Sequence, residues 1–265
     1  MGMNSPADIA ENYVDIGFGK SALPFWRMLV LAIFAGAFIA FGAVASSVSS
    51  CGVQPAPVSR LLGAAVFPVG LMLVLVAGAE LFTGNCLLIV PVLERESSAK
   101  LMFRNWAVVY VGNLIGSLLI AFTVVYADTF SLYDGKLAEF VVTTAVNKVK
   151  FPFVVALLRG VLCNMLVCLA VWVAFSADEL AGKIISLYMP IFLFVLCGFE
   201  HCVANMYFIP AGILAAARYG INAEGLNWGT FFLRNLLPVT LGNIIGGMVI
   251  IGIGYWFVYL KKDSH

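Results

Sequence analysis

Long apolar stretches alternate with short polar segments along almost the whole chain. Apolar runs cover about residues 27–47, 61–92, 105–127, 152–175, 184–215 and 233–260. A helix that crosses a bilayer needs roughly 20 consecutive apolar residues, and each of these runs is long enough. The pattern therefore predicts an all-helical membrane protein in which six spans form a single transmembrane domain over residues 27–260.

The amino-acid composition points to lipid as the solvent of this domain. Hydrophobic residues make up 62% of the 265 residues and charged residues only 11%, whereas charged residues are about 25% of ordinary soluble domains. The net charge is +1, and the chain has no basic run of the kind that binds nucleic-acid phosphates. We therefore expect the lipid bilayer, and no nucleic acid, as a partner.

Both ends of the chain lie outside the apolar runs. Residues 7–19 form an amphipathic segment with Asp8, Glu11 and Asp15, which predicts a cytoplasmic or interfacial helix within residues 1–26 rather than a cleaved signal peptide. Six spans place this segment on the same side as the tail, residues 261–265. With both termini in the cytoplasm, eight Lys and Arg residues lie inside against six outside, a weak bias in the usual direction. The expected location is the inner (plasma) membrane.

The second and fifth runs are too long, and too polar near their centres, for plain helices. The pattern G-x-E-x-x-x-x-N begins at Gly78 and again at Gly198, and a proline follows each copy, at Pro91 and Pro210. Non-helical backbone at membrane depth is tolerated only where protein buries it or water wets it. Both spans are therefore expected to be broken at this motif.

A second motif indicates that the two halves of the chain are repeats. Gly112-Asn113-Leu114-Ile115-Gly116 in the third run matches Gly242-Asn243-Ile244-Ile245-Gly246 in the sixth. Each half, about residues 27–127 and 152–260, then has three spans with the break in its second. Because three is odd, the second half enters the membrane upside down. Inverted repeats with paired broken helices build solute sites near the bilayer midplane.

Several motifs in combination resemble the formate/nitrite transporter family. They are Glu80 to Asn85, Asn105-Trp106 with Gly112-Asn113, Arg159-Gly160 with Cys163-Asn164, Gly198 to His201, and Pro238 to Asn243. The resemblance covers essentially the whole chain and is strongest to the hydrosulfide-channel branch. It implies an aquaporin-like fold of six spans, assembled as a homopentamer with one pore in each protomer.

His201 is the main candidate for chemistry in the pore. A histidine can gain and lose a proton near neutral pH, and ionisable groups inside a membrane are costly and usually functional. His201 lies at the break of the fifth run, and the resemblance places it in the lumen. Its counterpart in the repeat is Leu81, so the pore cannot be symmetric. The alternative is a histidine that only bonds neighbouring backbone.

Glu80 and Glu200 hold the same position in the repeat, which suits a structural role better than a chemical one. A carboxylate beside a helix break can accept hydrogen bonds from the freed backbone N–H groups. We therefore expect both glutamates, together with Asn85 and Asn205, to stabilise the two breaks.

Two basic residues lie near the start of the fourth run. The resemblance implies that Lys148, in the connector before it, lines an outer vestibule and attracts the anion, since a basic mouth concentrates anions. The alternative is a solvated loop lysine. Arg159 is expected to be an anchor and not a pore residue. It would lie either at the membrane interface, because long basic side chains reach toward water, or between helices.

The family pattern also implies how the pore is lined. Hydrophobic constrictions around His201 are expected at Phe67, Leu71, Phe82, Val167 and Phe194, and the polar side chains expected between them are Thr83 and Asn164. Taken without the resemblance, such apolar residues would be assigned to the core or the lipid-facing surface.

Together these residues indicate a channel or transporter for small monovalent anions of weak acids. A bare anion loses its hydration in an apolar constriction at a large cost in free energy, whereas a weak acid can cross in its neutral, protonated form. Lys148 would draw the anion inward, and His201 would supply or share a proton. Hydrosulfide is the expected main permeant, with formate and nitrite also permeant. A formate or nitrite channel is the alternative.

Two other classes of protein remain open. An aquaporin-like channel for neutral solutes would share the fold, although the sequence has no repeated Asn-Pro-Ala tripeptide. A membrane redox subunit would need paired histidines or several buried acids, and the chain has only two histidines. The six cysteines show no C-x-x-C spacing. We therefore expect no metal site, no cofactor and no enzymatic activity.

Overall fold

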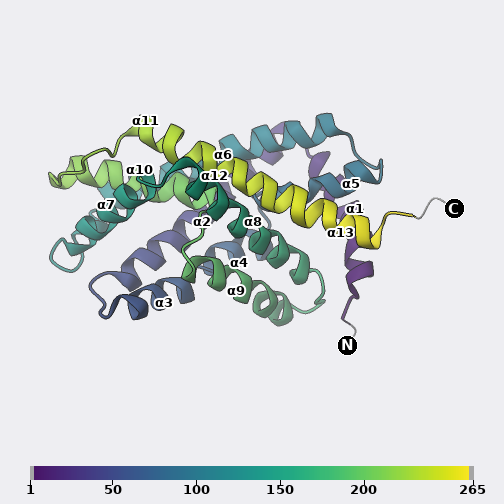
Figure 1. Cartoon of the computed structure of the whole chain (residues 1–265), viewed down its shortest axis with the longest axis horizontal. Coiled ribbons are helices and arrows are strands. Elements are labelled where there is room, and N and C mark those ends of the chain that lie inside the picture. Colours follow the sequence, from purple (N-terminus) through teal and green to yellow (C-terminus); the bar gives the residue numbers. More distant parts are fainter. Residues whose placement is uncertain (1–2, 263–265) are drawn as a thin grey trace.

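The computed structural model describes residues 3–262, and these residues are almost entirely helical (Figure 1). The first, third and fourth spans are α2 (Phe25–Ser50), α6 (Ala99–Tyr126) and α8 (Phe153–Ala174). The sixth span runs continuously through α11 (Trp228–Thr230), η3 (Phe231–Leu236), α12 (Leu237–Ile244), η4 (Ile245–Ile253) and α13 (Gly254–Tyr259). Of the predicted cytoplasmic tail, residues 263–265 lie outside the described part of the chain.

The second and fifth spans are both broken, as the repeated motif predicts. The second consists of α3 (Ala56–Val66), α4 (Val69–Val76), a non-helical stretch over residues 77–83, η1 (Gly84–Leu88) and α5 (Ile89–Leu93). The fifth consists of α9 (Leu180–Leu196), a gap at residues 197–201, and α10 (Cys202–Tyr219). Two residues after the end of each helix that precedes a gap lies a glycine with positive φ, Gly78 at +79° and Gly198 at +68°. Glycine adopts this conformation without steric penalty, so the chain can turn out of the helix there.

Each half begins with a short amphipathic helix, of which the sequence predicts only the first. α1 (Pro6–Ser21) contains the expected segment, whereas α7 (Lys136–Val149) occupies the region expected to be a connector, after the short turn η2 (Thr129–Ser131). In Figure 1, α1 lies at the end of the molecule that carries α5 and α13, and α7 lies at the opposite end near α3 and α11. The two halves are therefore upside down with respect to each other.

The third span of each half packs closely on the first span of the same half. A Cβ atom on Gly116 of α6 would collide with the backbone oxygen of Ile33 in α2, and one on Gly246 would collide with that of Val161 in α8. Small residues let helices approach closely in a membrane, where dispersion contacts and hydrogen bonds hold them together. The glycines of the repeated G-N-x-x-G motif thus serve packing within one protomer.

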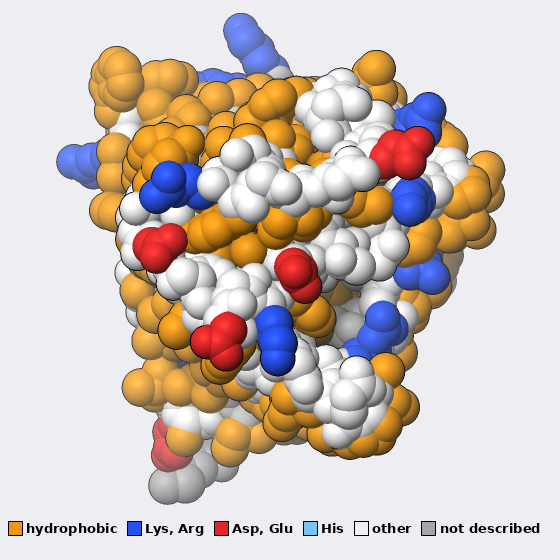
Figure 2. Space-filling view, turned by 90° about the vertical axis from the view of Figure 1, so that its left-hand side faces the viewer, with side chains coloured by type: hydrophobic (Ala, Val, Ile, Leu, Met, Phe, Trp, Pro, Cys, Tyr) orange, Lys and Arg blue, Asp and Glu red, His pale blue; other side chains and the backbone are white. Residues whose placement is uncertain are grey.

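The outer surface of the bundle suits a bilayer. Within residues 3–262, five helical segments are long and apolar enough to cross a membrane, namely Phe25–Ser50, Ala56–Val76, Ala99–Tyr126, Phe153–Ala174 and Trp228–Tyr259. Figure 2 shows the end of the molecule that lies at the left of Figure 1, where charged side chains of both signs gather and hydrophobic side chains surround them. The prediction of an all-helical, aquaporin-like bundle with an inverted three-span repeat and broken second and fifth spans is confirmed.

Candidate functional site

The two breaks are held by the same set of hydrogen bonds. In α6, the Asn113 side chain accepts the N–H of Phe82 at 2.9 Å and donates to the carbonyl oxygens of Ala32 and Glu80 at 2.8 and 2.9 Å. In α12, Asn243 makes the same three bonds with the corresponding backbone groups of the second half, at 2.9, 2.8 and 3.0 Å. Both side chains are fully buried. Each asparagine thus satisfies backbone groups that an interrupted helix leaves unpaired.

An ion pair lies beside each break. The Glu80 carboxylate accepts from the ammonium of Lys20 at 2.5 Å and from the side-chain amide of Asn85 at 2.7 Å. In the second half, Glu200 accepts from the ammonium of Lys148 at 2.8 Å and from the side-chain amide of Asn205 at 2.7 Å. A second asparagine extends each network. Asn85 donates to the side-chain oxygen of Asn105 at 2.9 Å in the first half, and Asn205 donates to that of Asn235 at 2.7 Å in the second.

These contacts change the expected role of the two glutamates. In the described part of the chain, their carboxylates bind lysine and asparagine side chains, and not the backbone N–H groups that the sequence predicts. The backbone at the breaks is instead bonded by Asn113 and Asn243. The glutamates therefore fix α1 and α7 to the breaks through their lysines.

Lys148 is a helical residue in an ion pair and not a free loop cation. It lies in the last turn of α7, and its side chain is only 16% exposed. Its ammonium also lies 5.2 Å from the centre of the Phe208 ring. Because the Glu200 carboxylate is 2.8 Å away, the two charges largely cancel at longer range.

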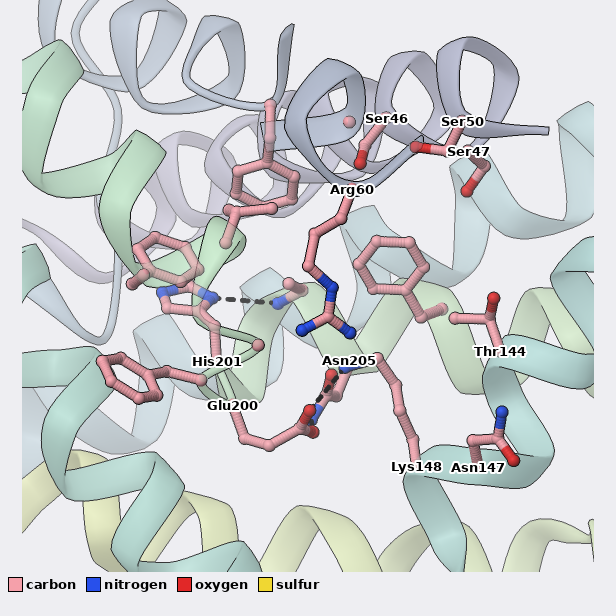
Figure 3. A pocket seen from close by; sticks show the side chains of 18 of the residues that line it. Ser46, Ser47, Ser50, Arg60, Thr144, Asn147, Lys148, Glu200, His201 and Asn205 are labelled. Carbon is pink, nitrogen blue, oxygen red and sulfur yellow. Dashed lines mark hydrogen bonds and ion pairs between the residues drawn. The ribbon is translucent and has the colours of Figure 1, made fainter. Parts of the chain in front are cut away.

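Two cavities approach the breaks from opposite ends of the molecule. The α7-side cavity has a volume of about 390 Å³, and Lys148, Glu200 and His201 are among the residues that line it (Figure 3). The α1-side cavity has a volume of about 510 Å³, and its lining includes Lys20 and Glu80. Each cavity thus contains one of the two Lys–Glu pairs.

One face of α3 and α4 connects the two cavities. Phe67 lines the α7-side cavity, Val74 lines the α1-side cavity, and Leu71 between them lines neither. Residues three or four positions apart face the same side of a helix, so these three side chains form one stripe. All three are at most 3% exposed. The closed part of the path is therefore about two helical turns, or roughly 10 Å, thick.

Of the other three predicted constriction residues, one lines a cavity and two are buried away from both cavities. Phe194 lines the α7-side cavity and packs edge-on against Phe67, with ring centres 5.6 Å apart. Phe82 packs edge-on against Tyr110 of α6 at 4.9 Å and lines neither cavity. Val167 of α8 is 1% exposed and also lines neither cavity. The barrier between the cavities is accordingly apolar along most of its lining.

His201 brings the two repeats together. It is the N-terminal cap of α10, where its Nδ1 accepts the N–H of Ala204 at 3.0 Å. Its Nε2 lies 2.9 Å from the hydroxyl oxygen of Thr83, which belongs to the break of the first half. The ring also stacks on Phe194 at 5.9 Å. The only polar side-chain pair that joins the two breaks directly, among the described residues, is therefore His201 with Thr83.

The capping bond fixes how the neutral ring carries its proton. A nitrogen that accepts a hydrogen bond has a free lone pair, so the proton of neutral His201 lies on Nε2 and is donated to Thr83. A doubly protonated ring would need two donors and would lose the Ala204 bond. The geometry therefore favours a neutral His201 that donates a hydrogen bond, and leaves the Thr83 hydroxyl proton free for another acceptor.

Asn164 is placed differently from the expected lumen residue. Its amide donates to the backbone oxygens of Thr83 and Asn243 at 3.2 and 2.7 Å, so it holds backbone from both halves. Its side-chain oxygen is buried and has no hydrogen-bond partner among the described residues. Only that oxygen remains available to a solute.

Two arginines in the α7-side cavity were not expected there. Arg159 lines this cavity and does not anchor α8 at the lipid interface: one guanidinium N–H donates to the carbonyl of Gly198 at 3.1 Å. Arg60 of α3 reaches into the middle of the cavity (Figure 3). The bond to Gly198 joins α8 to the gap that follows α9, so the structure fits Arg159 as an anchor between helices rather than as one at the lipid interface.

Comparison with known proteins identifies the family. The family model described as formate/nitrite transporter matches residues 7–257. The chain belongs to the formate/nitrite transporter family. A probable formate transporter of Methanothermobacter thermautotrophicus is 41% identical, over 97% of this chain and 98% of that protein. Formate channel FocA of Escherichia coli (strain K12) is 35% identical, over 98% and 96%.

Solved structures of the family support the same assignment. A pentameric formate channel with formate bound superposes with a TM-score of 0.80 at 39% identity, over 89% of this chain and 98% of that one. Members of the formate/nitrite transporter family are transport proteins, so the chain is a multi-pass membrane transport protein rather than an enzyme. These relatives and this solved structure are named for formate and not for hydrosulfide. They do not support the expected assignment to the hydrosulfide-channel branch.

Proposed function

We propose that this protein is a channel for formate and related small monovalent anions of weak acids. The observation that carries the proposal is the contact between His201 and Thr83, a pair of hydrogen-bonding groups in a path that is otherwise closed by apolar side chains. The relatives named as formate transporters and channels favour formate over hydrosulfide as the main permeant. Nitrite and hydrosulfide are further permeants.

The apolar barrier selects for weak acids. An anion that crosses roughly 10 Å without water loses most of its hydration energy, whereas formic acid, as a neutral molecule, loses much less. Phe67, Leu71 and Phe194 form one constriction, and Phe82 with Val167 forms the second. Chloride and other anions of strong acids cannot take a proton and are excluded.

His201 and Thr83 stabilise the small polar solute inside this barrier. With Nδ1 engaged by Ala204, a neutral ring that gave up its Nε2 proton would become an imidazolate, which is far too basic to persist. In this proposal the proton that neutralises the weak acid therefore comes from water in the cavities, and His201 does not supply it, contrary to the expectation from the sequence. His201 donates a hydrogen bond and Thr83 donates a second, so that the solute oxygens remain bonded at the narrowest point.

The membrane orientation and assembly follow the family resemblance. The α1 end, with both termini, faces the cytoplasm, and the α7 end faces outward across the cytoplasmic membrane. Five copies associate through the apolar sides of the bundle, with one path in each protomer. Light scattering in mild detergent tests the pentamer, and a monomer there would contradict it.

Flux into proteoliposomes tests the function. Uptake of formate, nitrite, hydrosulfide and chloride is measured against external pH, for the wild type and for His201→Asn. Asparagine is a favourable N-cap, so this variant keeps the start of α10 while removing the Nε2 donor. We expect weak-acid flux in the wild type that rises as the pH falls, no chloride flux, and at least about a tenfold loss of formate flux in the variant. A variant with wild-type rate, selectivity and pH profile would show that His201 is only structural.

A further inference from the structure

The α7-side cavity carries positive charge that its ion pair does not explain. Its charged lining residues are Arg60, Lys148, Arg159 and Glu200. Lys148 and Glu200 neutralise each other at 2.8 Å. Among the described residues, neither Arg60 nor Arg159 lies within ion-pair distance of a carboxylate. Two guanidinium charges are therefore left without a protein counter-ion in one cavity.

Both guanidinium groups meet at the same glycine. An Nη1–H of Arg159 donates to the carbonyl of Gly198 at 3.1 Å. The Nη1 atom of Arg60 would lie 2.9 Å from a Cβ atom placed on Gly198. From standard backbone dimensions, the two groups are within roughly 10 Å of each other. Glycine at position 198 thus supplies the positive φ of the turn and leaves room for Arg60.

The surroundings of Arg60 suit an anion rather than a second protein charge. In Figure 3 its side chain extends from α3 between the serines of α2 and the Lys148–Glu200 pair. Ser46 and Ser50 are both lining residues, and their hydroxyl oxygens lie against Gly63, one turn beyond Arg60. The Ser46 hydroxyl and the Arg60 guanidinium have no hydrogen-bond partner in the described part of the chain. The cavity therefore combines two cations with at least one uncommitted hydroxyl group.

The α1-side cavity has no corresponding pair of arginines among its described lining residues, although the two cavities are related by the repeat. The backbone oxygen of Arg159 accepts the backbone N–H of Glu200. In the first half, the backbone oxygen of Leu31 accepts the backbone N–H of Glu80 in the same way, so Leu31 corresponds to Arg159. Leu31 thus stands in the α1-side cavity where Arg159 stands in the α7-side cavity. The remaining charges of the α1-side cavity are Asp178 and Lys183, which are opposite in sign. The excess of positive charge is confined to one mouth of the path.

We propose that Arg60 and Arg159 form an anion-binding subsite in the α7-side cavity, which holds a small carboxylate or nitrite before it reaches His201 and Thr83. This subsite rests on the proposed function, because it supplies anions to that path. Guanidinium groups bind carboxylate oxygens in a planar, two-pronged geometry. Arginine also stays charged at every physiological pH, so the mouth keeps attracting anions when the barrier itself prefers the neutral acid.

Flux from the two sides tests the subsite. Vesicles are sorted by which end of the protein faces outward, and initial formate flux is measured in each direction for the wild type and for the double variant Arg60→Gln/Arg159→Gln. We expect the half-saturating formate concentration to rise at least about threefold for transport from the α7 side, more at low salt than at high salt, and not from the α1 side. Lys136→Gln, which removes a cation from the same face outside the cavity, is the matched control and should change neither value. An unchanged half-saturating concentration in the double variant overturns the proposal.

A second measurement does not require transport. Ser46→Cys, in a background where Cys51 and Cys197 are serine, is labelled with an anionic and with a cationic methanethiosulfonate reagent. We expect the ratio of anionic to cationic labelling rates to fall at least about threefold when both arginines become glutamine, and to return when they become lysine. An unchanged ratio overturns the subsite. A lower ratio in a protein that carries no weak-acid anion in either direction would keep the subsite and reject the proposed function.

Discussion

The break in the second span and the break in the fifth span are nearly identical in how they are held. Each has an asparagine that bonds three backbone groups, Asn113 in one and Asn243 in the other. Each also has a glutamate that binds a lysine from a preceding amphipathic helix. Polar groups of this kind are required wherever a helix stops inside a membrane, so both halves need the same solution.

The two breaks differ where the path passes between them. His201 in the second half corresponds to Leu81 in the first, Thr83 corresponds to Val203, and Arg159 corresponds to Leu31. None of these differences disturbs the bonds that hold the breaks. The comparison teaches that positions shared by the halves maintain the architecture, while positions that differ are candidates for transport.

The largest expected effect is the loss of either backbone-bonding asparagine. Asn113→Leu and Asn243→Leu each remove three hydrogen bonds from fully buried groups, and each unpaired buried group costs about 1–3 kcal/mol. We expect both variants to fail to yield a monodisperse protein in mild detergent, as judged by size-exclusion chromatography. Asn222→Ala, in an exposed loop, is the control. A variant of one half that folds normally would break the equivalence of the two breaks.

The next effect concerns the two ion pairs. Glu80→Gln and Glu200→Gln keep an acceptor for the neighbouring asparagine but remove the charge that faces Lys20 or Lys148. Breaking a fully buried pair costs about 3–5 kcal/mol, and because the lysine side chains are 23% and 16% exposed, solvent screening reduces this to about 1–2 kcal/mol.

We expect similar decreases in thermal unfolding temperature for the two glutamine variants. The surface variant Glu224→Gln should show none. A clear decrease in unfolding temperature for only one of the two glutamine variants would mean that the two ion pairs do not contribute equally to stability.

A smaller effect on stability, but a large one on transport, is expected at the asymmetric position. His201→Leu introduces the residue found in the first half. It removes the N-cap of α10, which costs about 1 kcal/mol, and it removes the bond to Thr83. Unfolding measurements and formate flux on the same preparation should separate a modest loss of stability from a loss of transport to background. Leu81→Met is the control for folding. Transport that survives His201→Leu would contradict a transport role for the position where the two halves differ.

The smallest effect sharpens the comparison between α1 and α7. α1 begins with a capping box, in which Ser5 and Asp8 bond each other's backbone, whereas α7 begins at Gly135 without a side-chain cap. Ser5→Ala should lower the free energy of unfolding by about 0.5–1 kcal/mol. A decrease outside that range would contradict the assignment of the cap.

The same cap predicts a weak pH dependence. Hydrogen bonds from Ser5 lower the pKa of Asp8 below its ordinary value of 3.8. A lowered pKa means that the folded state favours the carboxylate. This contribution is therefore present above pH 3.8 and is lost as the pH falls through the lowered pKa. The wild type should therefore be slightly more stable than Asp8→Asn above pH 3.8, and the difference should disappear as the pH falls through the lowered pKa.

The amino-acid sequence predicts the spans, the breaks and their inverted relation because repeated motifs impose the same local geometry twice. Gly78 and Gly198 are required by a backbone turn, and such requirements are visible in a single chain. The helix α7 was missed because its mixture of charged and apolar residues is shorter than a span and is also typical of a connector.

Side-chain pairing could not be predicted in the same way. Glu80 lies 60 residues from Lys20, and Glu200 lies 52 residues from Lys148, and nothing in the spacing of either pair signals contact. The motif G-N-x-x-G contains Asn113 and Asn243 but does not reveal which backbone groups they bond. Arg60, at the start of an apolar run, differs in no visible way from an ordinary interfacial arginine.

The correspondence between the halves also shows where the length of the chain can change. The difference in residue number between corresponding positions of the two halves is not constant. It is 128 for Lys20 and Lys148, 120 for Glu80 and Glu200, and 130 for Asn105 and Asn235. This difference is constant within each element and shifts only in the connectors, which are longer before the break in one half and after it in the other. Exposed connectors absorb added residues at little cost in free energy. A peptide tag inserted between the exposed residues Glu224 and Gly225 should therefore leave the bundle intact and give a handle for labelling the α7 end of the protein.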